Sequence, residues 1–163
     1  MKMIKNVILA FILGVMPLSV VWADSLDEQL LSAARNNDLE KMQKLVKFGA
    51  NVNAKDIGGW SNGETALMYA TKAGKFNMVK WLVENGADVN AVNNNKWNAI
   101  MYMTNQSYYE KEQLKVTKYL VSQGIDIHAK DKDSNNVFMI LVKKYKWEIA
   151  KFLVEQGADI NIK

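Results

Sequence analysis

The sequence predicts an all-α solenoid of about four helix-turn-helix repeats that are joined by hairpin-like loops. One short phrase of the form Gly-x-Asx-x-x recurs with its glycines 37, 38 and 33 residues apart, at 49–54, 86–91, 124–129 and 157–162. Apolar residues between the phrases follow helical spacing. The glycine of each phrase can close a helix with a left-handed turn. A fixed period of this length is typical of a solenoid, in which each unit buries its apolar face against its neighbours.

The first element is a predicted secretory signal peptide over residues 1–23. Lys2 and Lys5 give it a basic start, an almost wholly apolar run covers 7–21, and small residues stand at the positions that a signal peptidase reads, up to Ala23. A membrane anchor is the alternative, but a run of about fifteen residues is shorter than the roughly 20 that span a bilayer. We therefore expect cleavage after Ala23 and one repeat domain over 24–163.

Four repeats are expected, at about 26–55, 56–92, 93–130 and 131–163. The second is the clearest, because Thr65 is a candidate N-cap for a helix over 66–73 and apolar residues at i, i+1, i+4 and i+5 from Met78 mark a core-facing second helix. Asn98 and Asn136 are the equivalent N-caps of the next two repeats. The same spacing predicts helices at 30–36 and 39–48, at 99–106 and 114–122, and at 137–144 and 148–155.

The second repeat resembles a known family on specific residues. Thr65-Ala-Leu-Met-Tyr-Ala70, followed by Gly74 and then by Gly86-Ala-Asp-Val-Asn-Ala91, is similar to an ankyrin repeat, whose unit of about 33 residues starts Thr-Pro-Leu-His-x-Ala. The resemblance covers nearly all of the chain after residue 23. Here Ala66 and Met68 replace the Pro and His of the family, and a methionine can fill the histidine's space with an adaptable apolar side chain.

Two insertions explain the long first spacings. About four extra residues fall within 57–63, at the tip of a hairpin between repeats, and about five fall within 107–113, between the two helices of the third repeat. Insertions in a solenoid map to loops and often lie on the binding face.

The composition argues against catalysis. The chain has no cysteine and one histidine, His128, which stands where the other repeats have asparagine. Residues 131–136 begin like a calcium loop, but Asn136 and Val142 occupy the positions that need Gly and Glu. Positive and negative charges are interspersed, which argues against nucleic acid as a partner. We therefore predict no enzymatic activity, no cofactor and no metal; an enzyme or metal binder would need carboxylates and His128 to converge in one cleft.

Aromatic residues fall into two groups. Those in or beside the second helices are predicted to lie in the core, namely Phe76, Trp81, Trp147 and Phe152. Those in loops are candidates for contact with a partner, although a tryptophan can also fold back on the neighbouring repeat. This second group consists of Trp60, Trp97, Tyr108 and Tyr109.

The resemblance implies that a protein partner docks on the concave side, which hairpin tips and the ends of the first helices form. Lysines surround aromatic residues there, so a partner with an acidic rim is a hypothesis. Transferred by register, the candidate partner-binding residues are Lys55, Ile57, Trp60, Glu64, Lys72, Asn94, Asn95, Trp97, Asn105, Lys130, Lys132, Asp133, Asn135 and Lys143.

The function that these patterns favour is non-enzymatic binding of another protein in the bacterial periplasm, with no membrane association after signal cleavage. The bacterial setting is inferred from the short basic start and from the occurrence of the family. Two roles stay open, an adaptor for an exported protein and an immunity protein that neutralises a secreted toxin. Release outside the cell is the alternative location. Trp147, Ile149 and Phe152 are expected to leave an apolar C-terminal face, which serves a homodimer or a partner unless Lys146, Glu148, Lys151 and Glu155 cover it.

Overall fold

The computed structural model describes residues 25–57, 62–103 and 110–160, and the predicted signal peptide lies outside them. These residues form eight helices in four consecutive pairs. The pairs are α2 (Leu26–Arg35) with α3 (Leu39–Lys47), α4 (Ala66–Lys72) with α5 (Phe76–Glu84), α6 (Ala99–Met103) with α7 (Glu110–Ser122), and α8 (Val137–Lys143) with α9 (Trp147–Glu155). The predicted all-α repeat architecture is confirmed.

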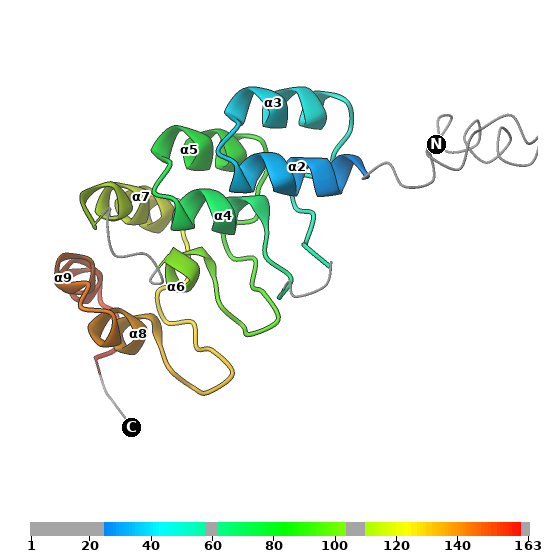
Figure 1. Ribbon diagram of the computed structural model, residues 1–163. Helices are drawn as coiled ribbons and strands as arrows, with labels where there is room; N and C mark the ends of the chain where they lie inside the picture. Colours follow the sequence, from blue (N-terminus) through cyan, green and yellow to red (C-terminus); the bar gives the residue numbers. More distant parts are fainter. Residues whose placement is uncertain (1–24, 58–61, 104–109, 161–163) are drawn as a thin grey trace, which may run out of the picture.

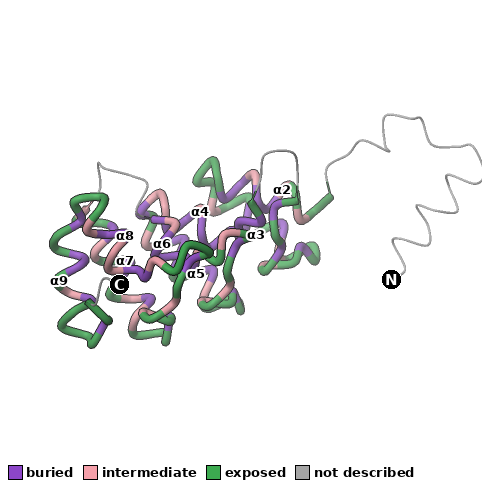
Figure 2. The backbone as a smooth tube through the Cα atoms, turned by 90° about the horizontal axis from the view of Figure 1, so that it is seen from below, coloured by how far each residue is buried: buried purple, intermediate pink, exposed green. Residues whose placement is uncertain are grey.

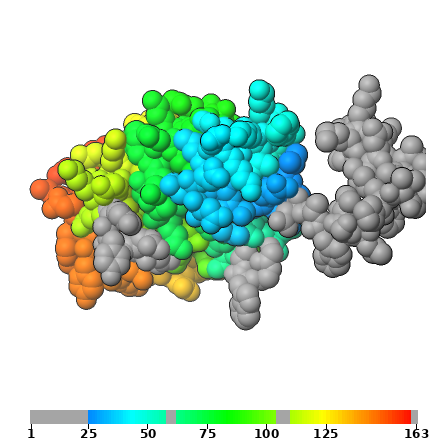
Figure 3. All heavy atoms as spheres, turned by 45° about the horizontal axis from the view of Figure 1, so that its top comes forward, coloured from blue at the N-terminus to red at the C-terminus, as the bar shows by residue number. Residues whose placement is uncertain are grey.

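The helix pairs stack in two layers, with loops projecting to one side. The inner layer holds α2, α4, α6 and α8, the outer layer holds α3, α5, α7 and α9, and the loops between pairs extend from the inner layer (Figure 1). In the space-filling view the repeats follow one another as bands of colour, each touching the next (Figure 3). Each repeat is therefore stabilised by its sequence neighbours, as in other solenoids.

The core lies between the two helical layers, and the loop tips are exposed (Figure 2). Leu30, Leu67 and Ile100 fill equivalent places in successive inner helices and are fully buried. Met68 and Met101 are also buried, as expected for a methionine in place of the family's histidine, while Met139 is half-buried. These side chains are apolar on the face that meets the next repeat, so stacking removes them from water.

The predicted helix caps are present. Thr65 Oγ1 accepts the Met68 N–H at 3.3 Å, and Asn136 Oδ1 accepts the Met139 N–H at 2.8 Å. Gly86 follows α5 with φ at +89°, in the left-handed region that a side chain would strain. Local signals therefore mark the starts of α4 and α8 and the end of α5.

Two helices begin four residues before the predicted start, and α9 begins one residue before it, at Trp147. Helix α2 begins at Leu26 and not at residue 30, because Ser25 caps it: Ser25 Oγ accepts the Glu28 N–H, and the Glu28 carboxylate accepts the Ser25 N–H. Helix α7 begins at Glu110 and not at residue 114. Glu110 and Glu112 lie in its first turn, where a negative charge interacts favourably with the helix dipole and stabilises the helix. Part of the predicted second insertion is therefore helical.

The predicted core aromatics are confirmed for Phe76, Trp81 and Phe152, which pack against the buried cluster. The prediction is wrong for Trp147, which is 56% exposed. Phe76 holds the equivalent position, and the next repeat covers it: the ring centroids of Phe76 and Tyr119 are 5.6 Å apart. Among the described residues no further repeat covers Trp147 in this way.

No helix within the described ranges is both long and apolar enough to cross a membrane.

Candidate interaction surface

In the last two hairpins, the side chain of the residue at the same position closes the turn by accepting backbone N–H groups. Asp131 Oδ1 accepts the N–H groups of Asp133 and Asn135, at 2.9 and 2.8 Å. Asn93 Oδ1 accepts the corresponding N–H groups of Asn95 and Trp97, at 2.9 and 3.0 Å. Short polar side chains bond the backbone in this way at turns, so these two hairpins are held by bonds within their own sequence.

The hairpins are also bonded to one another. The Asn94 N–H donates to the Asn62 carbonyl at 2.6 Å, and the Lys132 N–H donates to the Asn95 carbonyl at 3.1 Å. The Lys55 ammonium donates to the Val92 carbonyl at 2.8 Å. Three separate loops thus form one continuous rim. We call this rim, together with the last turns of α2, α4 and α8, the concave surface.

Asparagine side chains also hold the repeats in register below the rim. The Asn53 amide donates to the Gly86 carbonyl at 2.9 Å, and its oxygen accepts the Asp88 N–H at 2.8 Å. Asn90 makes the same pair of bonds one repeat further on, to Gly124 at 3.1 Å and Asp126 at 2.7 Å. Each side chain therefore joins two consecutive loops.

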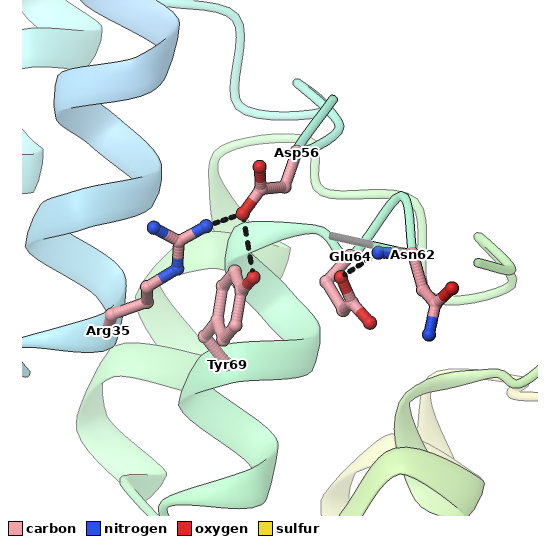
Figure 4. Close-up of polar contacts among 5 residues, drawn as sticks. All are labelled: Arg35, Asp56, Asn62, Glu64 and Tyr69. Carbon is pink, nitrogen blue, oxygen red and sulfur yellow. Dashed lines mark hydrogen bonds and ion pairs between the residues drawn. The ribbon is translucent and has the colours of Figure 1, made fainter. Parts of the chain in front are cut away.

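At the first hairpin, a polar cluster connects the inner helices to the rim. Arg35 of α2 forms an ion pair with Asp56, and the Tyr69 hydroxyl donates to the same carboxylate at 2.9 Å (Figure 4). The Arg35 guanidinium also lies over the Tyr69 ring, at 4.8 Å from its centroid. Burial raises the pKa of Tyr69 and outweighs the opposing effect of Arg35. The buried Asp56 charge is compensated within the protein.

A second tyrosine continues this row across the surface. Tyr102 of α6 meets Tyr69 edge to face, with ring centroids 6.0 Å apart, and Lys72 of α4 lies over the Tyr102 ring at 5.1 Å. Burial, with a contribution from the negative charge of Glu64, raises the pKa of Tyr102. Aromatic and cationic side chains thus alternate from α2 to α6.

Trp97 folds onto the next hairpin. It is half-buried, and its indole N–H lies 3.4 Å from the Asp131 carboxylate. Burial pushes the pKa of Asp131 upward, but hydrogen bonds from Asn135, Asp133 and Trp97 outweigh it and hold the pKa below its ordinary value. Of the two possibilities left open for Trp97, the structure shows contact with the neighbouring repeat.

The structure brings most of the residues predicted from sequence onto the concave surface. Ile57 is 88% exposed in the first hairpin. Glu64 is 6% exposed, and its carboxylate accepts the Asn62 N–H at 2.8 Å, so it is turned into the hairpin. Trp60, Asn105, Tyr108 and Tyr109 lie outside the described residues. The predicted residues that lie exposed or half-buried on the rim and helix ends are Lys55, Ile57, Lys72, Asn94, Asn95, Trp97, Lys130, Lys132, Asp133, Asn135 and Lys143.

Three residues of this surface were missed from the sequence, namely Asp56, Tyr69 and Tyr102. Aligning the repeats with one another would have revealed them, because Tyr69 and Tyr102 stand at the same position after their N-caps. Asp56 likewise matches Asp131. Sequence periodicity within the chain could therefore have found all three.

In the part of the chain that the structure describes, the acidic residues and His128 do not converge. Within the described ranges no group of three or more His, Asp or Glu side chains is placed to hold a metal ion. His128 is exposed, and its backbone N–H donates to Asp126 at 2.8 Å. The described part of the surface thus offers contacts and shows no assembled catalytic cluster.

A stack of helix pairs with bonded hairpins defines the class of repeat proteins that bind through a preformed surface. Residues 30–131 match the family model of ankyrin repeats (3 copies). The chain belongs to the ankyrin repeat family, whose members generally mediate interactions between proteins.

Individual relatives match most of this chain but only a part of their own length. The chain is 32% identical over 123 residues to an ankyrin repeat protein of Acanthamoeba polyphaga mimivirus, covering 76% of this chain and 34% of the relative. It is 28% identical over 133 residues to an ankyrin repeat protein of Fowlpox virus, covering 82% of this chain and 29% of the relative. It is 30% identical over 96 residues to an L-asparaginase of Dirofilaria immitis, covering 59% of this chain and 15% of the relative. The chain thus spans about a third or less of these relatives.

Proposed function

We propose that this protein is a non-enzymatic binding module that holds a protein partner on its concave surface in the bacterial periplasm. One observation carries the proposal: the hairpins are bonded to one another, through Asn94 to Asn62 and Lys132 to Asn95. A binding surface made of separate loops would lose conformational entropy when it orders against a partner. Here the loops are ordered beforehand, so more of the contact energy is available for affinity.

Exposed apolar residues on the rim supply candidate contacts. Ile57 is 88% exposed and Val92 is 37% exposed, and both lie in hairpins. Apolar side chains in a mostly polar rim are the residues from which a partner can exclude water. The rim thus combines fixed geometry with side chains suited to contact.

The similarity to an asparaginase does not favour a catalytic role. The matched part covers 15% of that protein. The described residues of this chain place no trio of acidic or histidine side chains together. The bonded hairpins of the described residues support binding as the function.

Capture of a partner by matched variants tests the proposal. The rim variant is the full chain with Ile57→Ser and Val92→Ser. The control variant carries Phe48→Ser and Val154→Ser on the outer layer, and these two residues are also exposed. After cross-linking in cells of the native host, we expect a partner with the wild type and the control and its loss with the rim variant. Equal capture by all three proteins, or loss with the control alone, would reject the concave surface.

Location has its own test. Fractionation and sequencing of the purified protein's amino terminus should give a periplasmic protein that begins at Asp24. A cytoplasmic protein that retains residues 1–23 would contradict the periplasmic part of the proposal.

A further inference from the structure

The carboxylates of the concave surface are mostly engaged within the protein. Asp56 pairs with Arg35 and accepts the Tyr69 hydroxyl, and Glu64 accepts a backbone N–H. Asp131 accepts two backbone N–H groups of its own hairpin. All three are buried. Of the acidic residues in the described hairpins, Asp133 is the exposed one. Little negative charge is therefore presented to a partner.

The cations are arranged differently. Arg35, Lys72 and Lys143 occupy the last turns of α2, α4 and α8, at equivalent places in their repeats. Among ion pairs between described residues, Arg35 joins one with Asp56, and neither lysine joins any. Lys72 lies over a tyrosine ring, and the Lys143 ammonium donates to the Asn135 side-chain oxygen at 3.0 Å. Both lysines therefore keep their net charge at the surface.

The rim adds further positive charge of the same kind. Lys55 donates to a backbone carbonyl of the next hairpin. Lys130 and Lys132 are exposed in the last hairpin. Neutral partners hold the side chains of Lys55, Lys72 and Lys143 without cancelling their charge, so a carboxylate that arrives from outside can pair with several of them.

We infer that the partner presents an extended acidic protein segment whose carboxylates pair with Lys72 and Lys143; this rests on the proposed function. Packed helices lie about 8–10 Å apart, and an extended chain advances about 3.3 Å per residue. One repeat therefore corresponds to about three residues of the segment. Lys72 and Lys143 are two repeats apart, so carboxylates about six residues apart match them.

A nucleic acid backbone is the other polyanion to consider. The lysines on this surface are separated by neutral asparagines and by Asp133, and the whole chain carries a formal net charge of +4. Tight binding of nucleic acid draws on many phosphate contacts to Lys and Arg. The spacing of charges thus favours carboxylates on a protein, and an oligonucleotide serves as a competing probe.

A peptide of about twelve residues that repeats Glu-Ser-Gly tests the inference, with Gln-Ser-Gly and a single-stranded oligonucleotide as comparison probes. Binding to the full chain is followed by fluorescence anisotropy. Lys72→Gln/Lys143→Gln removes two concave charges. Lys41→Gln/Lys151→Gln, on exposed positions of α3 and α9, removes two outer ones. Equal urea midpoints for these proteins establish that they are folded alike.

We expect the Glu peptide to bind the wild type and the outer variant equally and to bind the concave variant about fivefold more weakly, given the modest strength of exposed pairs. The Gln peptide should bind far more weakly than the Glu peptide. Equal binding of both peptides, an equal loss with both variants, or tighter binding of the oligonucleotide would overturn the inference. If the Glu peptide does not bind while partner capture still depends on Ile57 and Val92, the acidic assignment fails and the proposed function stands.

Discussion

Asn90 joins two consecutive loops, and truncating its side chain is expected to weaken the stack. The change Asn90→Ala removes two hydrogen bonds, to the Gly124 carbonyl and from the Asp126 N–H. A hydrogen bond contributes about 0.5–1.5 kcal/mol net. Because both groups are exposed and water can replace the amide, we expect a loss of about 1–2 kcal/mol. Asn90→His should cost nearly as much, since a neutral imidazole cannot donate and accept at the same edge.

Urea unfolding followed by circular dichroism measures this loss. With a denaturant slope of about 2 kcal/mol/M, within the usual range for urea, the midpoint should fall by roughly 0.5–1 M. The matched control is His128→Ala, at the equivalent position of the next repeat, where the structure records a backbone bond to Asp126. That change should stay within about 0.5 kcal/mol. An unchanged midpoint for Asn90→Ala, or an equal fall for His128→Ala, would refute the role of the asparagine.

Three further predictions concern single positions. The buried Thr71 Oγ1 has no hydrogen-bond partner among the described residues, so Thr71→Val should raise the free energy of unfolding by about 1 kcal/mol. Thr117→Val should lower it instead, because the buried Thr117 hydroxyl donates to a backbone carbonyl at 2.8 Å, and urea unfolding of the two variants gives the two signs. Gly86→Ala should cost about 1–2 kcal/mol from backbone strain alone, because the space around its Cα is open, and a midpoint equal to the wild type would contradict this. Because the pKa of Asp131 is lowered, its charged carboxylate stabilises the folded protein at pH values above the ordinary pKa of 3.8, and this stabilisation is lost as the pH falls from there through the lowered pKa. The difference in stability between the wild type and Asp131→Asn should therefore shrink on acidification. A difference that is independent of pH from 7 to 3 would exclude this stabilising role of the carboxylate.

The helices and turns could be predicted because their signals are local and repeated. A short N-cap, a helical apolar pattern and a glycine with positive φ recur in each unit, so the four registers support one another. The start of α2 at Leu26 was missed, since Ser25 and Glu28 form a capping box that apolar periodicity does not detect. Local side-chain chemistry decides such boundaries more than hydrophobicity does.

The surface was harder to predict because burial of a polar residue depends on contacts between repeats. Glu64 reads as an exposed hairpin residue, yet it is buried. Asn98 and Asn136 were expected only as N-caps, but their amide groups also donate to the Asp126 and Asp159 carbonyls of the following loops, at 2.8 and 2.9 Å. A threonine cap has no second group for this bond. The exchange from threonine to asparagine thus adds a link between the start of the first helix and the loop that ends the same repeat.

Trp147 illustrates the same limit at an outer position. Its place at the start of α9 matches that of Phe76 at the start of α5, and the two differ only in what the neighbouring repeat provides. Tyr119 packs on Phe76, whereas Trp147 stays exposed. Periodicity predicts which residues face the neighbouring repeat. Whether such a residue is covered depends on the side chains that the neighbouring repeat places against it.

Hydrogen exchange of the complex with the captured partner tests the central claim most directly. The account predicts that backbone amides of the hairpins, at 55–57, 92–96 and 130–133, exchange more slowly when the partner is bound. Amides exposed in the outer helices α3, α5, α7 and α9 should keep their rates. Protection confined to the outer helices, with unchanged hairpins, would contradict binding on the concave surface.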